Sequence, residues 1–213
     1  MKNDSKMTRT TILTTVVCLI PVILGVILYN KLPDTIVTHW DINGNPNGWE
    51  SKMVGAIFFP GGLVLLNIVF PLLLKIDPKY NTTNEKVKHM LHWIIPVVSI
   101  FCSGTTLATA MGKDVKVALI VPMFMGVFFV AIGNYLPKMT QSYTVGIKIP
   151  WTLNSEENWN RTHRMAGFLW VIGGIIMIIT GALGMGGISI MVTMIIMVIV
   201  PIIYSYLLSR KGI

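Results

Sequence analysis

The sequence from Ile188 to Leu208 reads ISIMVTMIIMVIVPIIYSYLL and contains no Asp, Glu, Lys or Arg. A helix of this length, rising about 1.5 Å per residue, crosses the roughly 30 Å hydrocarbon core of a bilayer. Similar apolar runs recur along the chain, and we expect six membrane-spanning helices at Thr11–Tyr29, Met53–Leu74, Met90–Met111, Val117–Leu136, Met165–Leu183 and Ile188–Leu208. The sequence therefore predicts an all-α integral membrane protein.

The composition of the 213-residue chain agrees with this expectation. Hydrophobic residues make up 53% of it and charged residues 12%, about half the charged share of a soluble domain. Because a soluble protein needs a solvated exterior, this composition excludes a soluble enzyme, a disordered chain and a free nucleic-acid binder. The two cysteines, Cys18 and Cys102, both lie in apolar runs, which leaves no disulfide framework and no cysteine metal site.

The basic residues predict the orientation of the chain. The two termini and the second and fourth connections carry 13 of the 17 Lys and Arg, whereas the other three connections carry 4. Basic connections stay on the cytoplasmic side of a membrane. We therefore expect both termini in the cytoplasm, and the net charge of +8 to reflect orientation rather than an acidic ligand.

Small and hydroxyl residues repeat inside two of the expected spans. The fifth span has glycine every seven residues, and the third has hydroxyls at spacings i, i+4 and i+7: Gly167, Gly174 and Gly181, then Ser99, Ser103 and Thr106. Both patterns favour close packing against a neighbouring helix. No Asp, Glu, Lys or Arg lies within a span, which argues against proton or sodium coupling through a membrane carboxylate but leaves transport of a neutral solute open.

The histidines give weak signals for chemistry. His89 and His92 have the i, i+3 spacing of a metal pair, yet no Cys, Asp or Glu is adjacent to complete a site. His163 with Glu156 and Glu157 could form an acid–base set, but neither a nucleophile nor a metal framework accompanies them. We expect no enzyme, no metal and no cofactor.

The first connection reads KLPDTIVTHWDINGNPNGW from Lys31 to Trp49. Its β-branched, roughly alternating stretch Thr35–Trp40 suits a strand, and the two Asn-Gly pairs, at 43–44 and 47–48, suit turns. We expect a compact hairpin-like cap that presents an aromatic, polar patch for a peptide or a lipid headgroup. Alternatively, the cap only anchors two helix ends.

The fourth connection contains SYTVGIKIPWTLNSEENWNRTHR from Ser142 to Arg164. Alternating apolar residues before Pro150 suggest an extended stretch, and the proline favours extended geometry at Ile149. A helix is expected after Pro150, with a capping box formed by Asn154 and Glu157. If that helix continues into the fifth span, Trp159 and His163 share one side. A basic, aromatic face would then lie on the cytoplasmic side of the bilayer. Anionic lipid alone could account for its arginines.

These two connections resemble known families. Leu32-Pro33-Asp34, Thr38-His39-Trp40 and Gly48-Trp49 resemble the outer loop of DUF1648 proteins. Gly146-Ile147-Lys148-Ile149-Pro150-Trp151-Thr152-Leu153, followed by Trp159 and Thr162-His163-Arg164, resembles the signature of the SdpI family of immunity proteins. The resemblance divides the chain into a DUF1648-like region, 1–74, and an SdpI-like region, 75–213, which contains a signature loop at 137–164.

The resemblance implies a bacterial plasma-membrane protein that protects the cell against a secreted, SDP-like peptide toxin. It also implies a receptor, since the family's namesake is thought to hold an ArsR-type autorepressor at the membrane. Two residues depart from the family pattern, because Lys148 and Ile149 stand where Arg and Thr are common, and lysine lacks the bidentate fork of arginine. The expected partners are the toxin, the repressor and membrane lipid, with no direct contact with nucleic acid, and the sequence leaves the oligomeric state open.

We assign two candidate sites from this reading. The toxin-binding candidates outside are His39, Trp40, Asp41, Asn43, Gly44 and Trp49. The signalling candidates inside are Gly146, Lys148, Pro150, Trp151, Thr152, Trp159, His163 and Arg164. The alternative function is a transporter or flippase of peptide or lipid, which lacks an energy-coupling residue in this chain.

Overall fold

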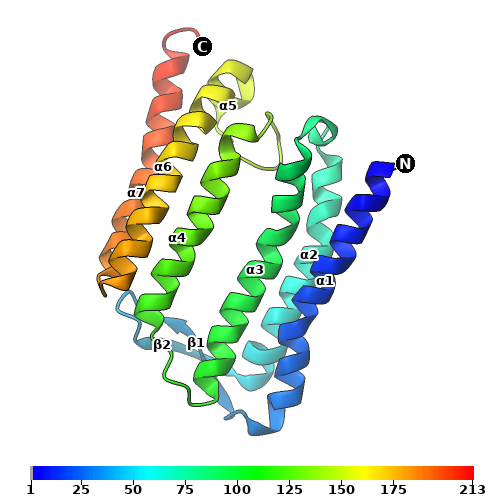
Figure 1. The fold of residues 1–213 in the computed structure, drawn as a ribbon, viewed down its shortest axis with the longest axis vertical. Coiled ribbons are helices and arrows are strands. Elements are labelled where there is room, and N and C mark those ends of the chain that lie inside the picture. The colour runs from blue at the N-terminus through cyan, green and yellow to red at the C-terminus, as the bar shows by residue number, and fades with distance from the viewer. Residues whose placement is uncertain (1) are drawn as a thin grey trace. The chain divides into compact units, whose positions relative to one another are not determined.

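The computed structural model describes residues 2–213, with the side chains of residues 2–6 and 81 excepted (Figure 1). Its long helices are α1 (Lys2–Leu28), α2 (Phe59–Ile76), α3 (Glu85–Ala110), α4 (Val117–Tyr135), α6 (Glu156–Ala182) and α7 (Gly186–Ser209). Six helical stretches of the described residues are long and apolar enough to cross a membrane. The predicted class and number of spans are confirmed, and the chain is a multi-pass membrane protein.

Short elements fill the connections. Two strands, β1 (Thr35–Trp40) and β2 (Pro46–Ser51), form a hairpin, and a short helix, α5 (Pro150–Asn154), precedes α6. Single turns of 3-10 helix lie at η1 (Tyr29–Lys31), η3 (Tyr80–Thr82) and η4 (Leu136–Lys138), and a π-helical turn, η2 (Val54–Phe58), precedes α2.

Three helices are longer than their apolar runs predicted. α1 begins at Lys2, α3 at Glu85 and α6 at Glu156, because polar residues continue the helix beyond the apolar segment. Acidic residues in the first turn of α3 and α6 suit the positive end of the helix dipole. Hydropathy therefore located these helices but placed their first residues too late.

The chain forms two compact units, and the first contains residues 1–74 and 88–117. Its core joins the hairpin to the helices around it through Leu32, Ile36, Ala56 and Leu107. Gly25 on α1 leaves room for the carbonyl oxygen of Ala56, the group that would pair with residue 60 in a regular helix. Pro60 has no N–H for that pairing, and the backbone widens into the π-helical turn just before it.

The second unit contains residues 75–87 and 118–213, and α6 is its central helix. A Cβ on Gly174 would lie 2.5 Å from the carbonyl oxygen of Gly126, and one on Gly167 would lie 2.7 Å from that of Gly133. Gly181 packs in the same way on Pro122 of α4. The predicted glycine seam is confirmed as a packing surface, and Figure 1 shows α4 and α7 beside α6.

Candidate functional site

The first candidate site is the β1–β2 hairpin, which confirms the predicted cap. The strands are antiparallel, with Val37 opposite Trp49 and Trp40 opposite Pro46. The register shifts twice, on either side of His39. Such bulges bend a strand and re-aim its side chains, so the simple alternation expected for β1 does not hold along its whole length. Ile36 is buried beneath the hairpin, where Gly55 gives it space.

The turn of the hairpin is built around Asp41. Its Oδ1 accepts hydrogen bonds from the backbone N–H groups of Asn43 (2.9 Å) and Asn45 (2.8 Å), and its Oδ2 accepts one from the Asn45 side chain (3.2 Å). The hydrogen bond from the backbone of Asn45 is the largest influence that lowers the pKa of Asp41. Gly44 has φ of 82°, so the turn predicted at Asn43-Gly44 is confirmed.

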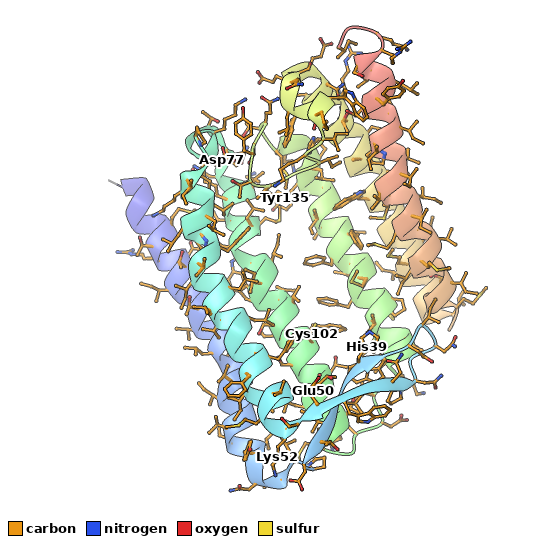
Figure 2. The ribbon with its side chains drawn as sticks, turned by 180° about the vertical axis from the view of Figure 1, so that it is seen from behind. His39, Glu50, Lys52, Asp77, Cys102 and Tyr135 are labelled. Carbon is orange, nitrogen blue, oxygen red and sulfur yellow. The ribbon has the colours of Figure 1, made fainter. Side chains whose placement is uncertain are left out.

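The turn predicted at Asn47-Gly48 is wrong, because both residues lie within β2. Gly48 stands opposite His39, and a Cβ at that position would lie 2.9 Å from the Cβ of His39. The glycine therefore permits a close approach of side chain to backbone rather than a turn. Next to it, Asn47 Oδ1 lies 2.5 Å from His39 Nδ1 and holds the exposed imidazole, which Figure 2 labels.

The aromatic candidates of the hairpin differ in exposure. Trp49 is 56% exposed, whereas Trp40 on the other strand is half-buried. Ile42 in the turn is also exposed. Trp49 is therefore the principal aromatic side chain that this hairpin offers to a partner.

The second candidate site is the signature segment, residues 137–164. The alternating stretch before Pro150 forms no strand, and residues 139–149 follow an irregular path. Ile149 is extended, with φ of −125° and ψ of 158°, and α5 begins at Pro150. The extended geometry predicted for Ile149 is confirmed, and so is a helix at Pro150.

The core of the signature segment is the pair Trp159 and His163. Their rings stack with centroids 3.9 Å apart, and both side chains are buried. The indole Nε1 donates to the carbonyl oxygen of Met139 at 2.9 Å. His163 Nε2 accepts from the N–H of Ile147 at 3.0 Å, so Nδ1 carries the proton and donates to the carbonyl oxygen of Trp159 at 2.9 Å. The imidazole is thus neutral, with both nitrogens bound to backbone groups.

This pairing confirms that Trp159 and His163 share one side of α6, but the predicted exposed aromatic face is wrong. The irregular stretch 139–149 folds over both rings and covers them. Only the basic half of the predicted face, Arg161 and Arg164, is exposed. His163 is also not paired with the neighbouring carboxylates, since Glu157 forms an ion pair with Arg161 at 2.6 Å.

Gly146 and Thr152 complete this core. Gly146 has φ of 125°, and a Cβ there would lie 2.5 Å from Cη2 of Trp159 and 2.8 Å from Nε2 of His163. Thr152 is fully buried, and its hydroxyl donates to the carbonyl oxygens of Ile147 (2.7 Å) and Ile149 (3.0 Å). Glycine and threonine are therefore required here by space and hydrogen bonding.

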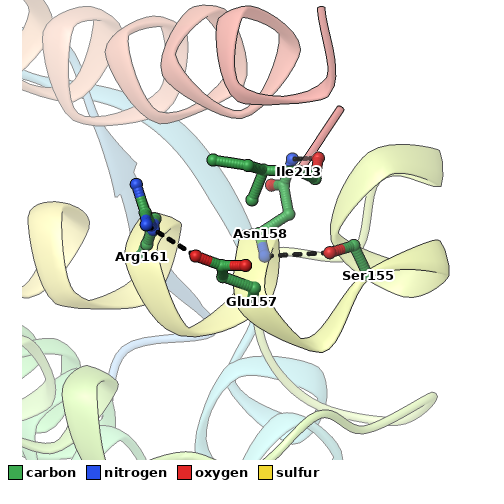
Figure 3. A network of polar contacts seen from close by, with 5 residues as sticks. All are labelled: Ser155, Glu157, Asn158, Arg161 and Ile213. Atoms are coloured by element: carbon green, nitrogen blue, oxygen red, sulfur yellow. Dashed lines mark hydrogen bonds and ion pairs between the residues drawn. The ribbon is translucent and has the colours of Figure 1, made fainter. Parts of the chain in front are cut away.

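The amino terminus of α6 is fixed by a polar network (Figure 3). Ser155, not Asn154, is the N-cap residue, and its Oγ accepts from the N–H of Asn158 at 3.2 Å. The capping box predicted from Asn154 is wrong, because Asn154 ends α5. Asn158 is buried, donates to the carbonyl oxygens of Ser205 and Ile213, and accepts from the Ser205 hydroxyl at 2.6 Å.

The remaining signature residues lie at the surface of the segment. Lys148 is exposed, and its Nζ donates to the carbonyl oxygen of Tyr143 at 3.2 Å. Tyr143 and Pro150 are exposed too, and half-buried Trp151 packs on Tyr206 with ring centroids 5.1 Å apart. The structure thus separates the signature into a buried set and a surface set.

Sequence reasoning missed three polar residues that hold the segment: Asp77, Lys79 and Gln141. Asp77 follows α2 directly, as Figure 2 shows, and its Oδ2 accepts from the Ser142 hydroxyl (2.5 Å) and from the N–H groups of Tyr143 (2.8 Å) and Thr144 (3.0 Å). Lys79 Nζ donates to Gln141 Oε1. The only local signal was an acidic residue before proline at the end of an apolar run.

The electrostatics of Asp77 follow from these bonds. Burial alone raises the pKa of its carboxyl group, but the hydrogen bonds from Ser142, Lys79 and Thr144 together lower that pKa below its ordinary value of 3.8. A carboxylate with a lowered folded-state pKa stabilises the fold above its ordinary pKa and loses this effect only as the pH falls through the lowered value. The Asp77 carboxylate is therefore fully charged at neutral pH.

The histidines of the candidate metal pair make other contacts. His92 Nδ1 lies 2.7 Å from the carbonyl oxygen of Lys88, and His89 Nδ1 lies 3.5 Å from the Thr10 hydroxyl. Within residues whose side chains are described, no group of three or more His, Cys, Asp or Glu could hold a metal ion.

Comparison with known proteins places both candidate sites in described families. Residues 16–64 match the domain of unknown function DUF1648, and residues 138–205 match the SdpI/YfhL protein family. The immunity protein SdpI of Bacillus subtilis (strain 168) is 26% identical over 194 residues, which cover 91% of this chain and 90% of that protein. No solved structure matches. The chain therefore matches the SdpI/YfhL family across its signature segment and DUF1648 ahead of it, and it is similar to an immunity protein over most of its length.

Proposed function

We propose that this protein is a membrane immunity protein that gives a bacterium resistance to a secreted antimicrobial peptide toxin. Similarity to an immunity protein along nearly the whole chain supports this function. The observation that carries the binding role is the hairpin that exposes Trp49 between two membrane-spanning helices. With both termini in the cytoplasm, as the distribution of Lys and Arg favours, this hairpin faces the toxin outside the cell.

The toxin-binding surface lies in region 1–74 and combines an aromatic ring with polar groups. Trp49 supplies apolar area at low entropic cost, and His39 supplies a polar group fixed by Asn47. Asp41, Asn43 and Gly44 shape the turn beside them. Trp40 on β1 is half-buried and therefore offers a partner less of its ring than Trp49 does.

We expect Trp49→Ala to weaken toxin binding about 30-fold, the effect of losing a central aromatic contact worth about 2 kcal/mol. Binding would be measured with labelled peptide on the protein in lipid nanodiscs. Trp93→Ala is the matched control, because Trp93 is also partly exposed but belongs to α3. Unchanged affinity of Trp49→Ala, with normal insertion, would move the binding site away from the hairpin.

The signature segment within region 75–213 is the proposed output of a receptor. Its surface residues Lys148, Trp151 and Arg164 would contact a cytosolic ArsR-type autorepressor, and its buried residues hold that surface in place. Such signalling requires the toxin to bind one conformation of the protein better than another, because equal affinities shift no equilibrium. Thr152 and Gly146 hold the backbone beneath this output surface, and exposed Pro150 begins α5 beside it.

The direct test is survival of a toxin-sensitive bacterium that expresses the protein, challenged with a panel of secreted peptide toxins. Protection by inserted protein, lost in Trp49→Ala, would support the immunity function and its site together. Inserted protein that protects against none of the toxins would contradict the immunity function.

Transport of the peptide or of a lipid is the second candidate function. It is favoured by one observation on α3: the hydroxyls of Ser99 and Ser103 are buried and, in the part of the chain that the structure describes, have no hydrogen-bond partner. Buried unpaired hydroxyls are uncommon and can line a polar path. Protein-dependent movement of labelled peptide across reconstituted vesicles would support transport, whereas binding without movement would support the receptor.

A further inference from the structure

The signature segment is held from outside both family regions. Asp77 and Lys79 lie between residues 16–64 and 138–205, in the short connection that follows α2. Asp77 is buried, and its Oδ2 accepts three hydrogen bonds from the consecutive residues Ser142, Tyr143 and Thr144. One carboxylate oxygen thus fixes residues 142–144, which lie within the irregular stretch 139–149.

A second set of contacts begins at Lys79 in the same connection. It runs through Gln141 and fixes the end of the segment that enters α5. Gln141 is buried, and its Nε2 donates to the carbonyl oxygens of Thr152 (2.8 Å) and Leu153 (2.9 Å) in α5. Its Oε1 accepts from Lys79 Nζ, which fixes the orientation of the amide. Residues 142–153, which include exposed Lys148, are therefore tied down at both ends by side chains on or bound to the connection after α2.

We infer that Asp77 is the positioning residue of the signature segment. Asp77, Lys79 and Gln141 together hold residues 142–153 in place, and we call this set of three side chains the clamp. The identity of the segment as a signalling surface rests on the proposed function, but the clamp itself does not. Hydrogen bonds to a charged acceptor are the stronger ones and are costly to break once buried. The covalent route also matters, since β2, η2 and α2 lead without a long loop from the hairpin to Asp77. Asp77 is therefore joined to the hairpin through the backbone of α2.

Asparagine at position 77 is the most informative replacement. Asp77 uses both oxygens as acceptors, because Oδ1 accepts from the N–H of Lys79 at 2.9 Å while Oδ2 accepts its three donors. The asparagine amide has the same size, but one of its two ends is an NH2 group, which cannot accept a hydrogen bond. In either orientation this NH2 group would face N–H or O–H donors. Asp77→Asn should therefore release the start of the segment without removing volume.

The release can be measured as trypsin cleavage after Lys148 in the full chain, reconstituted in nanodiscs where the protease reaches both faces. We expect Asp77→Asn to speed this cleavage at least about tenfold, since proteolysis follows the population of the opened segment. Cleavage after Lys113, an exposed lysine in the connection before α4, should not change and serves as the internal reference. Asp34→Asn, which replaces an exposed carboxylate in the first connection by an amide, is the matched control.

Two further variants keep the inference falsifiable. Asp77→Glu retains the charge and should cleave more slowly than Asp77→Asn, which a purely steric role would not require. Ser142→Ala removes one donor to Oδ2 and should speed cleavage after Lys148 about threefold, and it serves if Asp77→Asn fails to insert. Equal cleavage after Lys148 in wild type, Asp77→Asn and Ser142→Ala would overturn the clamp. Because no toxin is present, this outcome is separate from failure of the immunity function.

Discussion

Gly174→Ala is expected to destabilise the second unit by about 3 kcal/mol, at the upper end of what one added methyl group costs in a packed core. The added Cβ would lie 2.5 Å from the carbonyl oxygen of Gly126 and 2.9 Å from the backbone nitrogen of Val130. Backbone atoms of α4 cannot rotate away as the end of a side chain can, so the two helices must separate. Helices in lipid associate through such close packing. Separation of the helices at Gly174 would therefore also weaken the packing of Gly167 and Gly181 on α4.

The measurement is the midpoint of thermal unfolding of purified protein in nanodiscs, together with the amount inserted in the membrane. Gly104→Ala is the matched control, because Gly104 also lies within a long helix, α3, but has open space around its Cβ position. Alanine is the better helix former by up to about 1 kcal/mol, so Gly104→Ala should be neutral or stabilising. Equal unfolding midpoints for the two variants would contradict the packing role of the seam.

The sequence predicted those features that leave a local or periodic signal. Six apolar runs mark six spans because the bilayer demands about 20 apolar residues from each helix. The seam was visible because Gly167, Gly174 and Gly181 recur with helical spacing, and the hairpin because β-branched residues precede Asn43-Gly44. Each signal lies within a single element, so no knowledge of the tertiary fold was needed.

Features that depend on distant partners could not be predicted. Asp77 and the Ser142 hydroxyl are 65 positions apart, and nothing near Asp77 marks that pairing. His163 seemed exposed because it lies beside Arg164 on an amphipathic helix start, yet the stretch that covers it comes from residues 139–149. The choice of Ser155 over Asn154 as the cap was decided by α5, which uses Asn154 as its own last residue.

These contacts explain, in structural terms, which residue types occupy the buried positions of the signature. Trp159, His163 and Thr152 form hydrogen bonds with backbone groups of the segment. Loss of function on their replacement would therefore report a displaced segment as well as a lost contact. The surface residues Lys148 and Arg164 separate these effects, because neither holds the core.

Gly146→Ala is expected to cost about 3 kcal/mol or more, since two independent penalties apply. At φ of 125° a residue with a Cβ is strained by about 1–2 kcal/mol. The Cβ would also overlap Cη2 of Trp159 and Nε2 of His163, the ring pair around which the segment is built. Gly184→Ala carries only the first penalty, because Gly184 has φ of 75° but nothing near its Cβ position.

The two variants would be compared by unfolding midpoint in nanodiscs and by trypsin cleavage after Lys148. Gly184→Ala should show the strain alone and normal cleavage, whereas Gly146→Ala should lose more stability and expose Lys148. Trp159→Leu, which lacks the atoms that meet the added methyl group, allows a double-mutant cycle. The double variant should be less destabilised than the two single losses added together, because the overlap exists only when both groups are present. Strict additivity would show that overlap with the Trp159 ring contributes nothing to the cost of Gly146→Ala.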